Sequence, residues 1–230
     1  MLRAFTEGSA YVGLVMCLAG YAVGLWVQRR VRHPLAHPLV IAIALNVAAM
    51  ALLGIAPETF DASASKLSFL LGPATVALAV PLHRQMQLLR RNATAVLAGV
   101  LAGSVSAVLG VLALAALLGT DAQVLAAMLP KSVTTAIAMP LAEQLGGIPA
   151  MTMVCTCITG IMGATLCPLV FRWFRVTDEV AMGIAIGTAA HAVGTAQAVQ
   201  RSEVQGAMSG LAIVVAGLTT TGLLWLYALV

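Results

Sequence analysis

The chain has 230 residues, of which 61% are hydrophobic and only 9% are charged. Its mean hydropathy of +1.01 excludes a soluble globular domain and indicates an all-helical protein that crosses a membrane several times. We expect residues 1–230 to form one integral membrane domain. The formal net charge of +4 comes mainly from arginines between apolar runs, so it indicates membrane orientation and not nucleic-acid binding.

Five apolar runs predict full membrane spans, since about 20 apolar residues suffice for a helix to cross a bilayer. They are 11–28, 39–56, 93–119, 148–171 and 206–229. Gly99-x-x-x-Gly103 in one run, and Gly160 and Gly163 in another, are spaced to let a neighbouring helix approach closely. With an interrupted run at 66–85, the sequence predicts about six spans in all.

A polar stretch at residues 130–141 interrupts the apolar sequence and is the first candidate site. One lysine and three hydroxyl groups lie between two prolines: Pro130, Lys131, Ser132, Thr134, Thr135 and Pro140. Proline breaks helices, and lysine at the centre of a membrane helix costs about 2.5–3.5 kcal/mol. Non-helical backbone is tolerated at this depth only where it is buried in protein or lines a watery cavity. We therefore predict a segment, broken at both prolines, that holds a solute.

A similar motif occurs earlier in the chain. The pattern T-x-A-(L/I)-A-x-P-L-x-x-Q begins at Thr75, a further candidate for solute binding, and again 59 residues later at Thr134. The first copy has three helix-breaking residues: Gly72, Pro73 and Pro81. Paired, proline-interrupted segments such as 72–85 and 130–144 are typical of a transporter built from an inverted repeat. Chance similarity between two alanine-rich helices is the alternative.

A third unusual stretch, residues 181–200, is rich in glycine and contains a histidine. Gly187, His191 and Gly194 recur at about one helical turn. His191 is a candidate proton carrier, because an ordinary histidine titrates near physiological pH; a helix–helix hydrogen bond is the alternative of equal weight. Two hydroxyls on the same stretch complete the candidate solute-binding set: Thr188 and Thr195.

Arginine counting predicts the orientation, because lysine and arginine in short loops favour the cytoplasmic side. Basic segments alternate with acidic or neutral ones in the order 29–37, 57–65, 83–92 and 119–123. If Arg172 and Arg175 are also inside, span 148–171 runs inward, so residues 121–147 must start and finish outside and form a re-entrant hairpin. By the same count, residues 181–200 could enter and return on the cytoplasmic side. A complete crossing by 121–147, with parallel repeats, is the alternative.

Lys131 needs an anionic partner at membrane depth. In the empty protein we expect Glu143 to be this partner. In the loaded protein we expect a substrate carboxylate, with the free N–H groups of the half-helix after Pro130 as further donors. The alternative is that Lys131 snorkels to the outer surface. The sequence has no Ser-His-Asp order, P-loop or metal-ligand cluster, so we expect no enzyme activity, no metal site and no cofactor.

Three segments in order, 71–79, 130–135 and 187–196, resemble the LrgB/CidB family of antiholin-like membrane proteins. The resemblance implies a multi-pass protein of the bacterial inner membrane with a smaller partner of the LrgA/CidA type. It also implies a fold similar to that of the cation/proton antiporter and bile-acid symporter group, whose broken helices cross at the midplane. The related half of the plastidial glycolate/glycerate translocator implies transport of small monocarboxylates.

The main hypothesis is therefore alternating-access transport of a small monocarboxylate, such as pyruvate, glycolate or lactate, by a homo-oligomer. Transport could be coupled to a proton through His191. The alternative is a holin- or antiholin-like regulator of murein hydrolase export and cell lysis, which the family name, the small size and the Gly-x-x-x-Gly spacing favour. A transporter should discriminate between solutes, whereas a lesion-forming protein should leak solutes of graded size.

Overall fold

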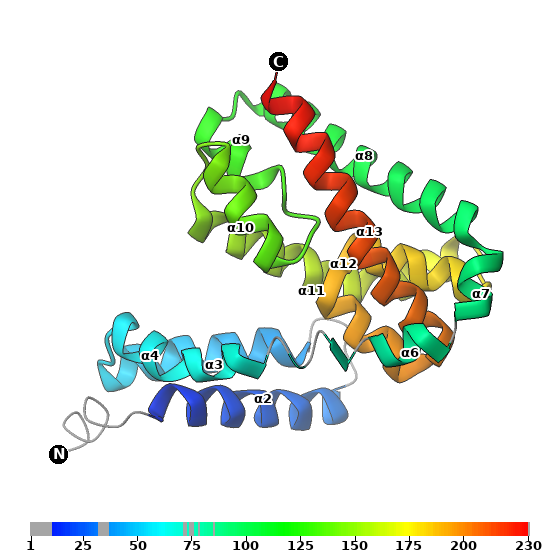
Figure 1. Ribbon diagram of the computed structural model, residues 1–230. Helices are drawn as coiled ribbons and strands as arrows, with labels where there is room; N and C mark the ends of the chain where they lie inside the picture. The colour runs from blue at the N-terminus through cyan, green and yellow to red at the C-terminus, as the bar shows by residue number, and fades with distance from the viewer. Residues whose placement is uncertain are drawn as a thin grey trace. The chain divides into compact units, whose positions relative to one another are not determined.

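The computed structural model describes residues 11–31, 37–70, 73, 76–77, 79–84 and 86–229. These residues form helices joined by short turns and contain no strand, which confirms the predicted all-helical class (Figure 1). The chain divides into two compact units, residues 1–77 and 78–230, which are described separately below. The single membrane domain expected from the sequence stays a prediction.

The first unit consists of three α-helices and one 3₁₀-helix in its described part: α2 (Val12–Val31), α3 (Pro38–Leu53), α4 (Pro57–Ala64) and η1 (Ser65–Leu70). Glycines on α2 let α3 and α4 approach closely. A Cβ added at Gly24 would lie 2.5 Å from the carbonyl oxygen of Pro38. The backbone N–H of Gly13 donates to Ser63 Oγ at 2.8 Å, which ties α2 to α4.

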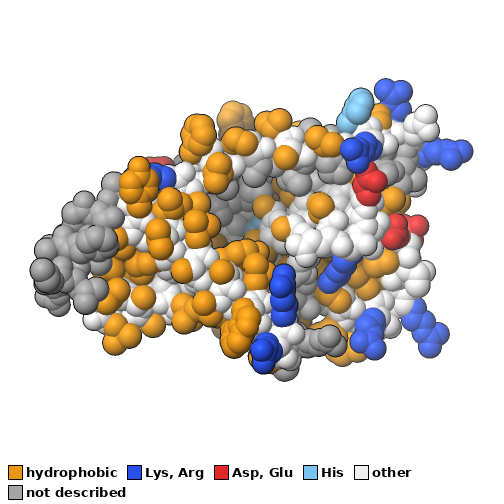
Figure 2. All heavy atoms as spheres, turned by 90° about the horizontal axis from the view of Figure 1, so that it is seen from below, with side chains coloured by type: hydrophobic (Ala, Val, Ile, Leu, Met, Phe, Trp, Pro, Cys, Tyr) orange, Lys and Arg blue, Asp and Glu red, His pale blue; other side chains and the backbone are white. Residues whose placement is uncertain are grey.

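Four of the described helices are long and apolar enough to cross a membrane: α2, α8 (Ala93–Leu118), α11 (Pro149–Trp173) and α13 (Glu203–Ala228). They match four of the predicted spans, and α3 is a fifth apolar helix of 16 residues. Large hydrophobic side chains stay exposed on these helices, and Figure 2 shows hydrophobic side chains spread over one face of the protein. The run at 66–85 falls partly outside the described residues, so the sixth predicted span stays a prediction.

The second unit contains a helical hairpin made of α9 (Ala122–Met128) and α10 (Thr135–Gln144). The chain leaves helical geometry around Pro130, as predicted, and turns through residues 129–134. Behind α10, the chain comes back against the end of α9: a Cβ added at Gly147 would lie 2.6 Å from the backbone nitrogen of Ala127. The Thr152 hydroxyl of α11 also donates to the Ala127 carbonyl at 2.9 Å.

The break expected at Pro140 is wrong, because α10 continues through this residue to Gln144. A proline inside a helix removes one backbone hydrogen bond but need not end the helix when its neighbours pack well. Pro81 also lies within a helix, α6 (Ala79–Arg84).

A second hairpin lies within α12 (Glu179–Arg201), whose helical geometry is interrupted at His191 (φ 37°, ψ −133°). A Cβ added at Gly194 would lie 2.7 Å from Cγ2 of Ile186, eight residues earlier. Eight residues of straight helix span about 12 Å, so the chain folds back at His191. The sequence predicted such a return for residues 181–200. α13 then runs beside both arms, touching Gly183 on the first and Val199 on the second.

The two hairpins start from opposite ends of the second unit. α9 and α10 lie beside the C-terminal part of α13, where Leu125, Leu141 and Leu145 pack with Leu224 (Figure 1). α12 starts beside the first residues of α8 and packs along the first half of α13. The end of this unit at which α12 starts, here called the arginine end, carries six arginines: Arg84, Arg90, Arg91, Arg172, Arg175 and Arg201.

Candidate solute-binding site

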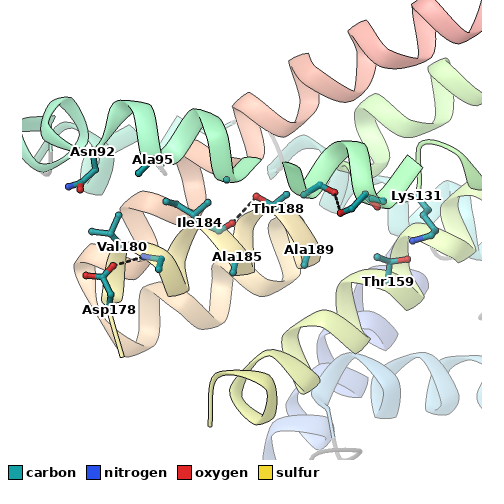
Figure 3. A pocket seen from close by; sticks show the side chains of 16 residues that line it. Asn92, Ala95, Lys131, Thr159, Asp178, Val180, Ile184, Ala185, Thr188 and Ala189 are labelled. Carbon is teal, nitrogen blue, oxygen red and sulfur yellow. Dashed lines mark hydrogen bonds between the residues drawn. The ribbon is translucent and has the colours of Figure 1, made fainter. Parts of the chain in front are cut away.

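A cavity of about 650 Å³ lies in the second unit between α8, the first arm of α12, α11 and the 129–134 turn (Figure 3). It extends from Asn92 and Asp178 at the arginine end to Lys131 at its inner end. The space exists because its walls are built from small residues: Ala95, Gly99, Gly103, Ala107, Ala181 and Ala185. A cavity of this volume is in the usual range for small-molecule sites.

Lys131 is the only lysine or arginine among the described residues that line this cavity. It follows α9 in the turn of the first hairpin, and it lines the same cavity as Ser106, which lies halfway along α8 and so about 20 Å from either end of that helix at 1.5 Å per residue. Lys131 makes no ion pair with any described residue. This depth disfavours snorkelling, in which the ammonium would have to reach an end of the bundle.

The expected ion pair between Lys131 and Glu143 is absent from the described part of the chain. Glu143 is exposed in the last turn of α10, whereas Lys131 precedes the first turn. The intervening helix of 10 residues is about 15 Å long. The two charges therefore cannot neutralise each other, and the expectation was wrong because the second arm of the hairpin is a continuous helix.

The predicted hydroxyl residues fall into two groups, those that line the cavity and those that do not. Ser132 is buried beside Lys131, lines the cavity and has no hydrogen-bond partner among the described residues. Thr188 also lines the cavity, but its hydroxyl donates to the Ile184 carbonyl at 2.8 Å. Thr134 and Thr135 begin α10, are half-buried and do not line the cavity.

Two predicted residues of the first motif copy, Thr75 and Gly72, lie outside the described residues. Pro73 is described and exposed, but its neighbours on both sides are not. The role of this copy, and its inverted relation to the second copy, therefore stays a prediction.

His191 and Thr195 do not line the cavity. They hold the tip of the second hairpin in place. His191 Nε2 lies 3.0 Å from the carbonyl oxygen of Thr156 on α11, and a carbonyl can only accept, so Nε2 carries the hydrogen. The Thr195 hydroxyl donates to the His191 carbonyl at 2.9 Å and lies 2.6 Å from Ser209 Oγ on α13. His191 therefore makes the helix–helix contact that was one of its two predicted roles.

The glycine spacings predicted to allow close packing do so in this unit. A Cβ added at Gly103 would lie 2.7 Å from Cγ2 of Thr188, and one at Gly160 would lie 2.6 Å from Cε1 of His191. α8 and α11 thereby receive the first arm and the tip of the second hairpin. Thr159 of α11, which lines the cavity, was missed because a threonine within an apolar helix carries no distinguishing pattern.

The chain resembles known proteins over nearly its whole length. Residues 17–229 match the LrgB-like family. The chain is 34% identical to the antiholin-like protein LrgB of Bacillus cereus (strain B4264) over 211 residues, 91% of this chain and 92% of that protein. The same figures hold for the antiholin-like protein LrgB of Bacillus anthracis (strain A0248). No solved structure matches the chain.

Proposed function

Because the chain belongs to the LrgB-like family of antiholin-like membrane proteins, which is not an enzyme family, we propose that it is a membrane carrier of small monocarboxylates. Pyruvate, glycolate and lactate are the solutes we propose, and the bacterial inner membrane is the proposed location. The observation that carries this proposal is the position of Lys131. A lysine that has no ion-pair partner among the described residues lines a cavity between span-length helices, where a cation needs an anionic partner.

A carboxylate suits the inner end of the cavity for two reasons. Lys131 supplies one positive charge, which matches one carboxylate group. Ser132 supplies a hydroxyl that has no partner among the described residues. Thr134 is the N-cap residue of α10 and makes no side-chain capping bond, but the first turn of this helix does not line the cavity, so a role of its N–H groups in binding the anion would require this turn to move.

The proposed membrane placement has α8, α11 and α13 crossing the bilayer and both hairpins re-entrant. The arginine end would face the cytoplasm, because short arginine-rich segments favour that side. The described residues from 79 to 229 have no arginine or lysine at the opposite end, which carries Asp121 and Glu143. The cavity would then open toward the cytoplasm, and the 121–147 hairpin would enter from outside.

Two successive span-and-hairpin pairs support an inverted organisation. α8 runs away from the arginine end and is followed by the 122–144 hairpin, which starts at the opposite end. α11 runs toward the arginine end and is followed by the 179–201 hairpin, which starts there. Inverted broken elements that meet near the midplane are typical of alternating-access carriers.

Proton coupling through His191 remains part of the proposal. Because this residue is buried away from the cavity, coupling would require the second hairpin to move.

The alternative function, regulation of murein hydrolase export and cell lysis, is favoured by the antiholin-like names of the relatives. Purified protein in liposomes separates the two functions. A carrier takes up labelled pyruvate saturably while retaining dyes of graded size. Release of the dyes without saturable pyruvate uptake would support the lytic role and contradict the carrier.

The family resemblance also leads us to propose a homo-oligomer that works beside a smaller membrane protein of the LrgA/CidA type. Light scattering of the detergent-purified protein tests the first proposal. Uptake measured with and without a co-reconstituted LrgA-type protein tests the second: an equal rate in both samples would exclude a required partner.

A further inference from the structure

We propose that Thr159 of α11 is a further solute-binding residue, whose hydroxyl donates to the same carboxylate as Lys131. The inference rests on the proposed function and names a residue that the sequence motifs do not indicate. Thr159 lines the cavity together with Lys131 and Ser132. Figure 3 shows Thr159 and Lys131 at the same, inner end of the cavity, from different elements.

The hydroxyl of Thr159 is not bonded to its own helix. Threonine in a helix commonly donates to the carbonyl four residues earlier, and four described threonines do so: Thr152, Thr188, Thr195 and Thr221. Thr159 makes no hydrogen bond with any described residue. The Cys155 carbonyl is therefore not its acceptor, and the hydroxyl stays available to a ligand.

The four hydroxyls that line the cavity divide in the same way. Ser106 donates to the Gly103 carbonyl at 2.9 Å, and Thr188 donates to Ile184. Ser132 and Thr159 have no partner within the described part of the chain; Ser132 follows Lys131 directly in the sequence, and Figure 3 shows Thr159 beside Lys131. A polar group at this depth that stays unsatisfied costs free energy. The available donors thus gather around the single cation and not along the cavity walls.

The arrangement would join two elements through the bound anion. A carboxylate has two oxygens and can accept from several donors at once. Lys131 and Ser132 come from the turn of the first hairpin, whereas Thr159 comes from α11. The Thr152–Ala127 hydrogen bond holds α11 against this hairpin, so the two elements that carry the donors are already in contact. Preorganised donors of this kind favour binding.

The test is the concentration dependence of pyruvate uptake in proteoliposomes. Thr159→Val keeps the shape of the side chain but removes the hydroxyl, and we expect the KM to rise about tenfold, the usual effect of losing a hydrogen bond to a charged group. Thr159→Ser restores the donor and should return the KM close to the wild-type value. Thr221→Val is the matched control, because the Thr221 hydroxyl is bonded to Gly217 outside the cavity; its KM should be unchanged.

The outcomes separate this inference from the proposed function. If wild type takes up pyruvate saturably, Lys131→Gln does not, and Thr159→Val matches wild type, the role of Thr159 is overturned and the carrier function stands. If wild type shows no saturable uptake, both fall. Should Thr159→Val melt early in detergent, Thr159→Ala makes the same comparison. A rise in KM that serine does not reverse would assign Thr159 to packing and also overturn the inference.

Discussion

His191 Nε2 lies 3.0 Å from the carbonyl oxygen of Thr156, which fixes the tip of one hairpin to the first third of α11. The backbone of His191 has a φ of 37°, a conformation that residues with a side chain rarely adopt. Such strain costs about 1–3 kcal/mol and persists only where the surroundings impose it. The contact with Thr156 is one of the interactions that impose it here.

Replacing His191 should therefore distinguish the effect of backbone strain at this residue from the effect of losing its hydrogen bond to Thr156. His191→Ala loses the bond to Thr156 and keeps the strained backbone, so we expect a lower melting temperature in detergent. His191→Gly loses the same bond but relieves the strain, and it should melt above His191→Ala. Equal melting temperatures for the two variants would show that the backbone at residue 191 is not strained.

A methyl group at Gly103 should disturb the contact between α8 and α12. The added Cβ would lie 2.7 Å from Cγ2 of Thr188, so Gly103→Ala should cost about 1–3 kcal/mol from overpacking. Thr188→Ser removes that methyl and keeps the hydroxyl, so the double variant should recover most of the loss. Gly110→Ala on the same helix is the control, because no atom lies within 4 Å of its added Cβ. The measurement is thermal melting, and a double variant no better than Gly103→Ala would refute the contact.

The stability of the first unit should fall on acidification because of His37. This residue caps α3: its Nδ1 accepts from the N–H of Leu39 at 3.4 Å. Burial lowers the pKa of His37, so the folded protein favours the neutral ring. Its contribution to stability is thus fully present above the unfolded-state pKa of about 6.5 and is lost as the pH falls through the lower folded-state pKa.

His37→Asn tests this pH dependence, because asparagine can cap the helix without titrating. We expect the melting temperature of wild type to fall more steeply than that of the variant between about pH 7 and pH 5. Parallel curves over this range would contradict the role of His37.

Much of this architecture could be predicted from the sequence, because lipid solvation leaves a strong signal. Apolar length located the long helices, Pro130 marked the turn between α9 and α10, and arginine counting indicated that residues 181–200 could return to the side from which they started. The glycine spacings on α8 and α11 indicated close neighbours, which the second hairpin provides.

The remaining features of the site depend on tertiary packing and could not be predicted from the sequence. Glu143 was expected beside Lys131, but α10 continues through Pro140 and carries the carboxylate away. The sequence pattern indicated Thr188 and not Thr159. Only the folded backbone determines that the Thr188 hydroxyl bonds to its own helix while the Thr159 hydroxyl stays available.

The proposed topology predicts which positions face each side of the membrane. In a variant without the four native cysteines, single cysteines at residues 121 and 147 should react with an impermeant maleimide added outside intact cells. A cysteine at residue 179 should react only after permeabilisation. Labelling of 121 and 147 from opposite sides would show that this segment crosses the membrane completely.

Uptake of labelled pyruvate by proteoliposomes containing wild type, Lys131→Gln or Glu143→Gln tests the carboxylate site most directly. Both variants remove one charge, but only Lys131 lines the cavity, whereas Glu143 is exposed at the far end of α10. We predict saturable uptake by wild type and Glu143→Gln, and none by Lys131→Gln. Equal uptake by wild type and Lys131→Gln would contradict a carboxylate site built on this lysine.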